Sequence, residues 1–427
     1  MLSHLSDMKA ADSSAIPADL QTAPLLTARD IARLSGLGGW MRAALGIVAH
    51  ISRGALIITV PDGRKFRFEG PSPGETGAII VRDKNFARRL LLGGGIGFAE
   101  AYMDGQWDTP DLRTLLRVIA NNNASIGAKA RGSRLLVLME WIQHSIMQRN
   151  SKRGARRNIE YHYDLGNEFY ALWLDDSMTY SSALFAHADD SLEEAQHNKY
   201  QALARRISLG RDHRLLEIGC GWGGFAEFAG SEIGCRVTGI TISPKQYEFA
   251  RKRIFEKGLA DRVEIVMQDY RDLSLQYDRI ASIEMFEAVG EAYWPRYFSK
   301  LRDSMLPGGL AGLQLITIAD RHFDSYRRGR DFIQRYIFPG GMLASPSVLR
   351  QQFSRAGLRL MEHASFGPDY ADTLRRWHER FLSKWPEIEK LGFDTRFRRM
   401  WQYYLAYCES GFSSGNTDVA QITLARA

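Results

Sequence analysis

Two glutamates, Glu284 and Glu287, lie in the run SIEMFEAVG (282–290), whose other residues are mostly apolar. Removing a charged carboxylate from water is costly unless it has a partner. A glutamate in such a run therefore either points to solvent at a strand end or faces a site that needs it. In a site, a carboxylate can hold a substrate or remove a proton. The neighbouring segments decide between these possibilities.

A glycine-rich turn precedes this run in the sequence. The segment LLEIGCGWGGF (215–225) passes from an apolar strand-like stretch through Gly219 and Gly221 into a helix-like stretch. Glycines let the backbone turn tightly and bring its amides close to a ligand. The pattern E-I-G-C-G resembles the S-adenosylmethionine loop of class I methyltransferases more than the GxGxxG dinucleotide loop. The following strand ends in GITIS, without the acid that commonly contacts a ribose.

Strand-like and helix-like segments alternate from about residue 190 onward. Candidate strands are 214–219, 235–241, 263–269, 278–286 and 310–318, with helices beginning near Trp222, Ser243 and Glu291 and an earlier helix capped by Ser191 and Glu194. This alternation predicts an α/β fold with a doubly wound, mainly parallel sheet. Ligands bind at the carboxyl ends of the strands in such sheets, and we expect Glu287 at one of these ends.

Length and composition indicate two domains. The 427 residues exceed one typical domain, and 54–70 form a hairpin pattern around Asp62-Gly63. We predict a flexible N-terminus (1–30), an α+β domain (31–147), a basic linker (148–160) and a final domain (161–427). The GGGIG run at 93–97 follows helix-like residues and is expected to be a turn or packing point.

The charge balance of +7 fits nucleic acid, an anionic membrane surface or solubility alone. The N-terminus lacks the features of a secretion signal, and no apolar run reaches the length of a membrane span, so a cytoplasmic location is expected. Cys220, Cys235 and Cys408 have no ligand spacing, so no metal site is expected.

Several long motifs together resemble the cyclopropane-fatty-acid synthase family, including its mycolic acid cyclopropane synthases. They are YHYDLGNEFYALWLDDSMTYSSALF (161–185), LLEIGCGWGG, VTGITISPKQ, DRIASIEMFEAVG, RYIFPGG (335–341) and FGPDYADTLRRWHERF (366–381). The resemblance covers about residues 50–420. It implies a class I methyltransferase Rossmann-like sheet with a smaller N-terminal α+β lipid-binding-type domain, and S-adenosylmethionine as cofactor.

The resemblance also assigns residues to the cofactor. The family's contacts fall on Tyr180, Ser181, Gly219, Gly221, Ile242, Gln246, Asp269, Tyr270 and Arg271. For the chemistry, methyl transfer to an acyl double bond leaves a carbocation, which aromatic faces stabilise. Candidates for such walls are Tyr161, Tyr163, Phe169, Tyr170, Phe286 and Tyr370.

The family's proposed base is a bound bicarbonate. Its holders fall on Glu287, Tyr370, Ser182 and Ile318. The match breaks where Ser182 replaces a cysteine, Ala288 replaces a histidine and Ile316 replaces the bicarbonate-holding histidine. Isoleucine offers an anion no side-chain hydrogen bond, so bicarbonate binding is left open. Glu287 is then expected to hold the base or to act as the base.

The resemblance implies methylation of unsaturated acyl chains of membrane phospholipids, ending in a cyclopropane. A methylene- or methyl-branched product is the first alternative, because the histidine is missing, and N-methylation of a small amine is the second. A non-catalytic lipid-binding protein is a further possibility, which the intact loop glycines disfavour.

The expected partners follow from this substrate. The basic residues Arg149, Lys152, Arg153, Arg156 and Arg157 could hold the protein at the inner, anionic face of the membrane. We expect no nucleic acid partner, since no recognition module is apparent. The family often forms homodimers, and nothing in this sequence fixes the oligomeric state.

Overall fold

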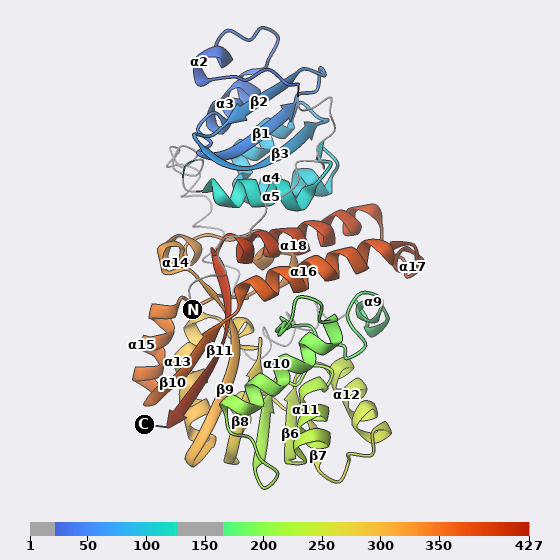
Figure 1. Ribbon diagram of the computed structural model, residues 1–427, viewed down its shortest axis with the longest axis vertical. Coiled ribbons are helices and arrows are strands. Elements are labelled where there is room, and N and C mark those ends of the chain that lie inside the picture. Colours follow the sequence, from blue (N-terminus) through green and yellow to red (C-terminus); the bar gives the residue numbers. More distant parts are fainter. Residues whose placement is uncertain (1–21, 124, 126–164, 427) are drawn as a thin grey trace. The chain divides into compact units, whose positions relative to one another are not determined.

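The computed structural model describes residues 22–123, 125 and 165–426. These residues form two compact units, the first holding residues up to 125 together with Asp394–Ser414, and the second holding 165–393 with the last strand. Figure 1 traces both units and labels their elements. No helix among the described residues has the length and apolar character needed to cross a membrane, and no cluster of potential metal ligands occurs among them.

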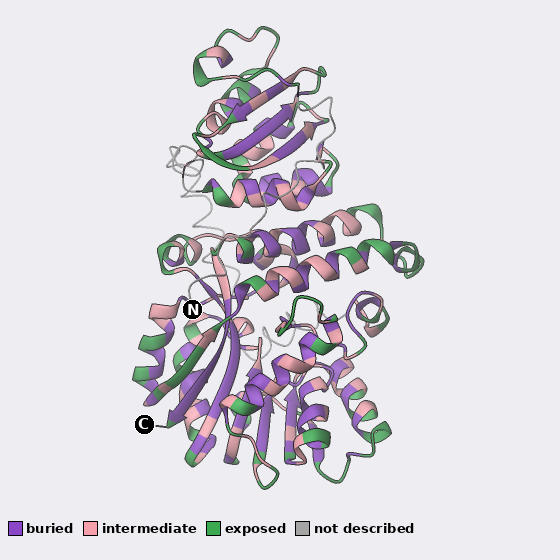
Figure 2. Cartoon of the chain, in the orientation of Figure 1, coloured by how far each residue is buried: buried purple, intermediate pink, exposed green. Residues whose placement is uncertain are grey.

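The first unit contains a four-stranded sheet in the order β2-β1-β3-β4. Its strands are β1 (Arg53–Thr59), β2 (Lys65–Glu69), β3 (Ser72–Val81) and β4 (Trp107–Asp108). The predicted hairpin is confirmed, since β1 and β2 pair antiparallel on either side of Asp62-Gly63. β3 returns parallel to β1, and the sheet strands are largely buried (Figure 2).

Helices of the first unit are α2 (Ala28–Ile31), α3 (Gly39–Val48), α4 (Phe86–Met103), α5 (Leu112–Asn121) and α18 (Thr395–Ser413). The GGGIG run lies inside α4, where Gly94 breaks the helix with a φ of 53°. The structure corrects the expected domain boundary, because α18 belongs to this unit instead of to an uninterrupted domain over 161–427. Glu409 of α18 forms ion pairs with Arg113 and Arg117 of α5.

The second unit is built on a seven-stranded sheet in the order β10-β11-β9-β8-β5-β6-β7. Its strands are β5 (Arg214–Ile218), β6 (Arg236–Thr241), β7 (Val263–Met267), β8 (Tyr277–Ile283), β9 (Met305–Ile318), β10 (Leu358–Ser365) and β11 (Thr417–Arg426). Strands β5 to β9 pair parallel with one another, while β11 runs antiparallel to β9 and β10. The predicted mainly parallel α/β sheet is confirmed.

Helices cover both faces of this sheet, as expected for a doubly wound fold. They are α9 (Asn167–Ala171), α10 (Leu192–Arg206), α11 (Gly224–Phe228), α12 (Pro244–Glu256), α13 (Trp294–Asp303), α14 (Asp320–Tyr326), α15 (Pro346–Ala356), α16 (Gly367–Ser383) and α17 (Trp385–Lys390). Successive residues of a strand point to opposite faces. Accordingly, Leu215 packs in the core beneath α10 to α12, and Leu216 packs in the core beneath α13 and α15.

Two short segments differ from the predicted elements. A π-helical turn, η2 (Ala229–Ile233), follows α11 before the chain enters β6. β8 was expected to continue to residue 286, but it ends at Ile283 because Glu284 adopts a φ of 49°. A 3-10 turn, η4 (Phe286–Ala288), comes next and carries Glu287. Few non-glycine residues adopt a positive φ, so this bend is a special feature of the site edge.

Candidate active site

The carboxyl ends of five parallel strands bring the predicted site residues to one edge of the second unit. Gly219 follows β5, Ile242 follows β6, Asp269 follows β7 and Glu284 follows β8. The end of β9 carries Ile316 and Ile318. In a doubly wound sheet this edge is where ligands bind. The topology therefore makes neighbours of residues that lie about a hundred positions apart.

The loop after β5 has the shape that a ligand requires. Gly219 and Gly221 have φ values of 80° and 54°, in the left-handed region that favours glycine. The amides of Gly219 and Cys220 donate to the Ile240 carbonyl of β6, at 2.9 and 3.0 Å, and so fix the turn. A Cβ at Gly219 would lie 2.7 Å from Met285 Cγ, whereas one at Gly221 would meet nothing within 4 Å. Backbone at Gly221 is thus open to a ligand such as S-adenosylmethionine.

The ends of β6 and β7 present the other expected cofactor residues. Gln246 is buried at the start of α12 and accepts a hydrogen bond from Thr241 Oγ1 at 3.0 Å. The Asp269 carboxylate binds the Arg271 guanidinium at 2.6 Å, so these two side chains hold each other in place. Tyr270 is partly buried, and this raises the pKa of its phenol to about 12. Their contact with a cofactor stays a prediction.

Aromatic rings surround Tyr180. Its ring centroid lies 5.4 Å from that of Tyr170, 5.5 Å from that of Trp173 and 5.4 Å from that of Trp377. Tyr370 approaches the same cluster, with its ring 6.2 Å from Trp377. An aromatic cluster thus adjoins a residue of the proposed catalytic set.

The other expected aromatic walls have different surroundings. Phe169 and Tyr170 are fully buried. Phe286 is also buried and packs against Trp294 and Phe298 in the core on one face of the sheet. Tyr161 and Tyr163 lie outside the described residues.

Glu284 is held by three hydrogen-bond donors. The backbone amide of Ser182 and Nε2 of Gln314 each donate to its Oε1 at 2.8 Å. The Tyr370 phenol donates to Oε2 at 2.7 Å. Burial raises the pKa of the Glu284 carboxyl, and the donors and the nearby Lys199 charge oppose this rise. The donors and Lys199 make the rise smaller than burial alone would give, but the pKa of Glu284 stays above its ordinary value.

Glu287 has a different environment. Its Oε1 accepts a hydrogen bond from the backbone amide of Ile316 at 2.5 Å, and its Oε2 is buried with no hydrogen-bond partner among the described residues. Burial, reinforced by the negative charge of Glu284, raises the pKa of Glu287 to about 8. The Glu287 carboxyl is therefore mainly protonated at neutral pH.

The residues expected to hold bicarbonate are brought together only in part. Tyr370 and the Ser182 amide both donate to Glu284. The Ser182 hydroxyl donates to the Ala183 carbonyl at 2.9 Å. Ile318 is buried, and its amide donates to the Ala344 carbonyl. The donors predicted for an external anion thus bind a carboxylate of the chain itself, and we derive no step through bicarbonate.

Three important residues escaped the sequence prediction. Glu284 was noted beside Glu287 but given no role, although a second acid in an apolar run was a usable signal. Gln314 lies in β9 among apolar residues, which was a weaker signal. Lys199 looked like an ordinary surface residue of a helix.

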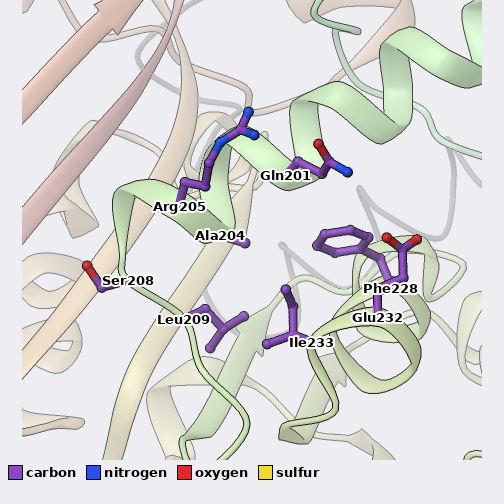
Figure 3. A pocket seen from close by; sticks show the side chains of 8 residues that line it. All are labelled: Gln201, Ala204, Arg205, Ser208, Leu209, Phe228, Glu232 and Ile233. Carbon is purple, nitrogen blue, oxygen red and sulfur yellow. The ribbon is translucent and has the colours of Figure 1, made fainter.

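A groove on the second unit lies away from this edge (Figure 3). It has a volume of about 310 Å³ and is lined by Gln201, Ala204, Arg205, Ser208, Leu209, Phe228, Glu232 and Ile233. These residues come from the end of α10 and the turn after it, from Phe228 at the end of α11, and from η2. These segments lead into the amino ends of β5 and β6. The groove is therefore at the edge opposite the predicted site residues.

Comparison with known proteins agrees with this geometry. The family model for mycolic acid cyclopropane synthetase matches residues 150–422, which is well over half of the chain. The chain belongs to this family. As a member of the family, it is an S-adenosylmethionine-dependent methyltransferase.

Relatives within and near the family span most of the chain. Tuberculostearic acid methyltransferase UfaA1 of Mycobacterium tuberculosis is 40% identical over 82% of this chain and 83% of its own length. Cyclopropane-fatty-acyl-phospholipid synthase of Escherichia coli K12 is 34% identical over 86% of this chain and 95% of its own. The crystal structure of mycolic acid cyclopropane synthase CmaA1 with SAH and CTAB superposes with a TM-score of 0.58 at 28% identity, covering 63% of this chain and 97% of that one.

Proposed function

We propose that this methyltransferase adds a methyl group to the double bond of an unsaturated acyl chain of a membrane phospholipid. The names of the relatives support a lipid substrate, since one is a cyclopropane-fatty-acyl-phospholipid synthase and another is a tuberculostearic acid methyltransferase. Fold similarity to a coclaurine N-methyltransferase, at 20% identity, concerns the fold alone. It gives no support to an amine substrate.

The observation that carries the mechanism is the set of donors around Glu284. Bound S-adenosylmethionine supplies an electrophilic methyl group for the alkene. The cation left on the acyl chain must then lose a proton to a base. Glu284 is the carboxylate to which Ser182, Gln314 and Tyr370 all donate, and these donors favour its ionised form. We assign proton removal to Glu284, and with it the part that the sequence analysis gave to Glu287.

Glu287 then has a neutral role beside the base. Its pKa of about 8 leaves Glu287 mainly protonated at neutral pH, beside Glu284 with its three donors. The negative charge of Glu284 opposes ionisation of Glu287, so the state with one proton on the pair is favoured. A neutral Glu287 can donate a hydrogen bond but cannot remove a proton.

Two products are compatible with a base at this place. Proton loss from the new methyl group with ring closure gives the cyclopropane. If a hydride first shifts to the original cation, the charge moves to the carbon that bears the methyl group, and proton loss then gives a methylene branch. The replacement of the expected histidine by Ile316 and the identity to the tuberculostearic acid methyltransferase favour the branched product. The cyclopropane is the second candidate.

A membrane surface is the proposed place of action, because acyl double bonds lie within a bilayer. The basic run 149–158, which could contact an anionic leaflet, lies outside the described residues. Reversing its charges should weaken binding to anionic vesicles in a manner that depends on salt. If binding to anionic vesicles is unchanged, the basic run serves only as a linker.

The test is to incubate the purified protein with S-adenosylmethionine and vesicles of unsaturated phospholipid. Acyl products are then identified by mass spectrometry after a derivatisation that locates double bonds, because a cyclopropane and a methylene branch share one mass. A methylene branch supports the favoured product, and a ring supports the second candidate. No added carbon on any lipid would contradict the proposed substrate.

A further inference from the structure

Lys199 of α10 is the one buried lysine among the described residues. Its Nζ donates to Ser181 Oγ at 2.7 Å and to Gln196 Oε1 at 2.6 Å. Nζ also lies 4.8 Å from the centroid of the Tyr200 ring. Lysines are almost never fully buried unless they are paired, so this position requires an explanation.

One chain of hydrogen bonds connects Lys199 to Glu284 through the backbone. Gln196, which accepts from Lys199, donates through Nε2 to the Ser181 carbonyl at 3.0 Å. Lys199 and Gln196 together hold both the side chain and the carbonyl of Ser181. The next amide along the chain is that of Ser182, which donates to Glu284. Lys199 thus fixes the segment that supplies one of the three donors to the proposed base.

A second chain of hydrogen bonds reaches Glu284 from the Lys199 backbone. Gln421 of β11 donates through Nε2 to the Lys199 carbonyl at 3.0 Å and to Gln314 Oε1 at 3.2 Å. Gln314 in turn donates to Glu284 Oε1 and, at 3.3 Å, to the Ser182 carbonyl. The two routes meet at the same carboxylate, so α10, β9 and β11 position it jointly.

Lys199 is the positive charge among three acidic side chains. Carboxyl groups of Glu284, Asp175 and Glu217 all attract the ammonium group, with Glu284 as the strongest of the three. Tyr200, whose hydroxyl forms a 2.6 Å hydrogen bond with Thr179, also faces it. Around Glu284 itself, Lys199 is the nearby cation, Glu287 the nearby acid and Tyr370 the nearby phenol. A buried carboxylate without a cation would be driven toward its protonated form.

We propose that Lys199 is a positioning residue for the catalytic carboxylate, which orders the Ser181-Ser182 segment and supplies the buried positive charge that keeps Glu284 ionised. This inference rests on the proposed function, in which Glu284 removes the proton. Burial lowers the pKa of Lys199 to about 7, against the attraction of its three acidic neighbours. Lys199 is therefore about half charged at neutral pH and mainly charged below it.

The first test measures the ionisation of Glu284 directly and needs no lipid turnover. Infrared difference spectra recorded over a pH series follow the protonated carboxyl band, which E284Q assigns. In K199M we expect the titration midpoint of Glu284 to move upward by at least about one pH unit, as loss of a nearby opposite charge predicts. An unchanged midpoint in a folded variant would overturn the proposal.

A second variant separates charge from hydrogen bonding. K199Q keeps a donor near Ser181 but removes the charge, and we expect it to shift the midpoint while disturbing the Ser181 segment less than K199M does. The matched control is K252M, because Lys252 is 75% exposed on α12. Its midpoint should equal that of the wild type. Circular dichroism and thermal unfolding show that each variant is folded.

Turnover provides the link to the proposed function. If the wild type methylates lipid, K199M should lower kcat, and the acidic limb of its pH profile should move by the same amount as the infrared midpoint. A loss confined to KM for S-adenosylmethionine would indicate a cofactor role instead and would contradict the positioning role. If the wild type methylates no lipid, the proposed function fails, while the infrared titration still decides whether Lys199 controls Glu284.

Discussion

Tyr370 of α16 donates a hydrogen bond of 2.7 Å to Glu284, which follows β8. Sequence analysis instead expected Tyr370 to share an external anion with Glu287. The Glu284 carboxylate, and not an external anion, therefore accepts the hydrogen bond from Tyr370. Glu287, three residues later, turns to the Ile316 amide of β9. Two acids that look alike in the sequence thus have different hydrogen-bond partners.

Replacing each acid by glutamine distinguishes their roles. E284Q should lower kcat for lipid methylation by about 10²-fold or more, the usual contribution of a general base. E287Q should retain most of the activity at pH 7, because glutamine resembles the neutral carboxyl that the raised pKa of Glu287 predicts. Single-turnover assays with S-adenosylmethionine binding measured separately provide the check. If E287Q loses more activity than E284Q, Glu287 is the base instead.

Tyr370→Phe removes one donor from the Glu284 carboxylate. Hydrogen bonds to charged groups contribute about 1.5–3 kcal/mol, so kcat should fall by about tenfold or more. Since the lost donor favoured the ionised form, the pKa of Glu284 should rise and the acidic limb of the kcat profile should move to higher pH. The control is Tyr247→Phe on α12, whose hydroxyl only accepts from Arg251. If kcat falls but the acidic limb of its pH profile stays at the same pH, the Tyr370 phenol does not control the ionisation of Glu284.

Gly221→Ala tests the ligand loop against a matched glycine. Gly221 and Gly258 both have positive φ, 54° and 66°, and an added Cβ meets no atom within 4 Å at either. Each alanine variant should lose about 1–2 kcal/mol of stability from left-handed strain. Only G221A should also weaken binding of S-adenosylhomocysteine, by at least about tenfold, in calorimetry. Equal affinities in the two variants would show that the loop backbone does not approach the ligand.

Glu217 at the end of β5 predicts a pH dependence of stability. Burial raises its pKa from 4.5 to about 8, and its Oε2 has no partner among the described residues. The native state therefore binds more protons than the unfolded state between these values, so the free energy of unfolding falls as pH rises from about 4.5 to 8. The stabilisation is complete below 4.5. At about 1.4 kcal/mol per pH unit, the whole effect is at most about 5 kcal/mol.

The measurement is urea unfolding of wild type and Glu217→Gln at several pH values, followed by tryptophan fluorescence. The variant should lose part of the downward slope between pH 5 and 8. Glu287 adds a fall of the same sign, and the lowered pKa of Lys199 adds a rise above pH 7, so only the difference between the proteins reports Glu217. Glu264→Gln on the exposed side of β7 is the control. Identical slopes for all three proteins would contradict the prediction.

Local patterns were sufficient for most of the fold and for the glycine turn after β5. Apolar runs located β5 to β9, and Ser191 with Glu194 marked the start of α10, where the capping box is present. They could not reveal the bend at Glu284, because a positive φ in a non-glycine residue leaves no mark in a sequence. Nor could they show that Lys199 is buried, since that depends on β9 and β11 packing against α10. The packing of α18 with α5 is likewise a long-range contact.

A substitution at Glu409 tests whether α18 belongs to the first unit. It is buried on α18, with its carboxylate 2.5 Å from Arg113 Nε and 3.1 Å from an Arg117 nitrogen. The arginines keep about a quarter of their side-chain surface exposed, so Glu409→Gln should destabilise the first unit by about 2–3 kcal/mol, less than a fully buried pair would. Amide hydrogen exchange in β1 and β3 should then speed up at least tenfold, while exchange in β5 and β6 stays unchanged. Glu69→Gln is the control, because its 3.4 Å ion pair with Arg67 is exposed and worth at most about 1 kcal/mol. Equal acceleration in both units would show that α18 does not belong to the first unit alone.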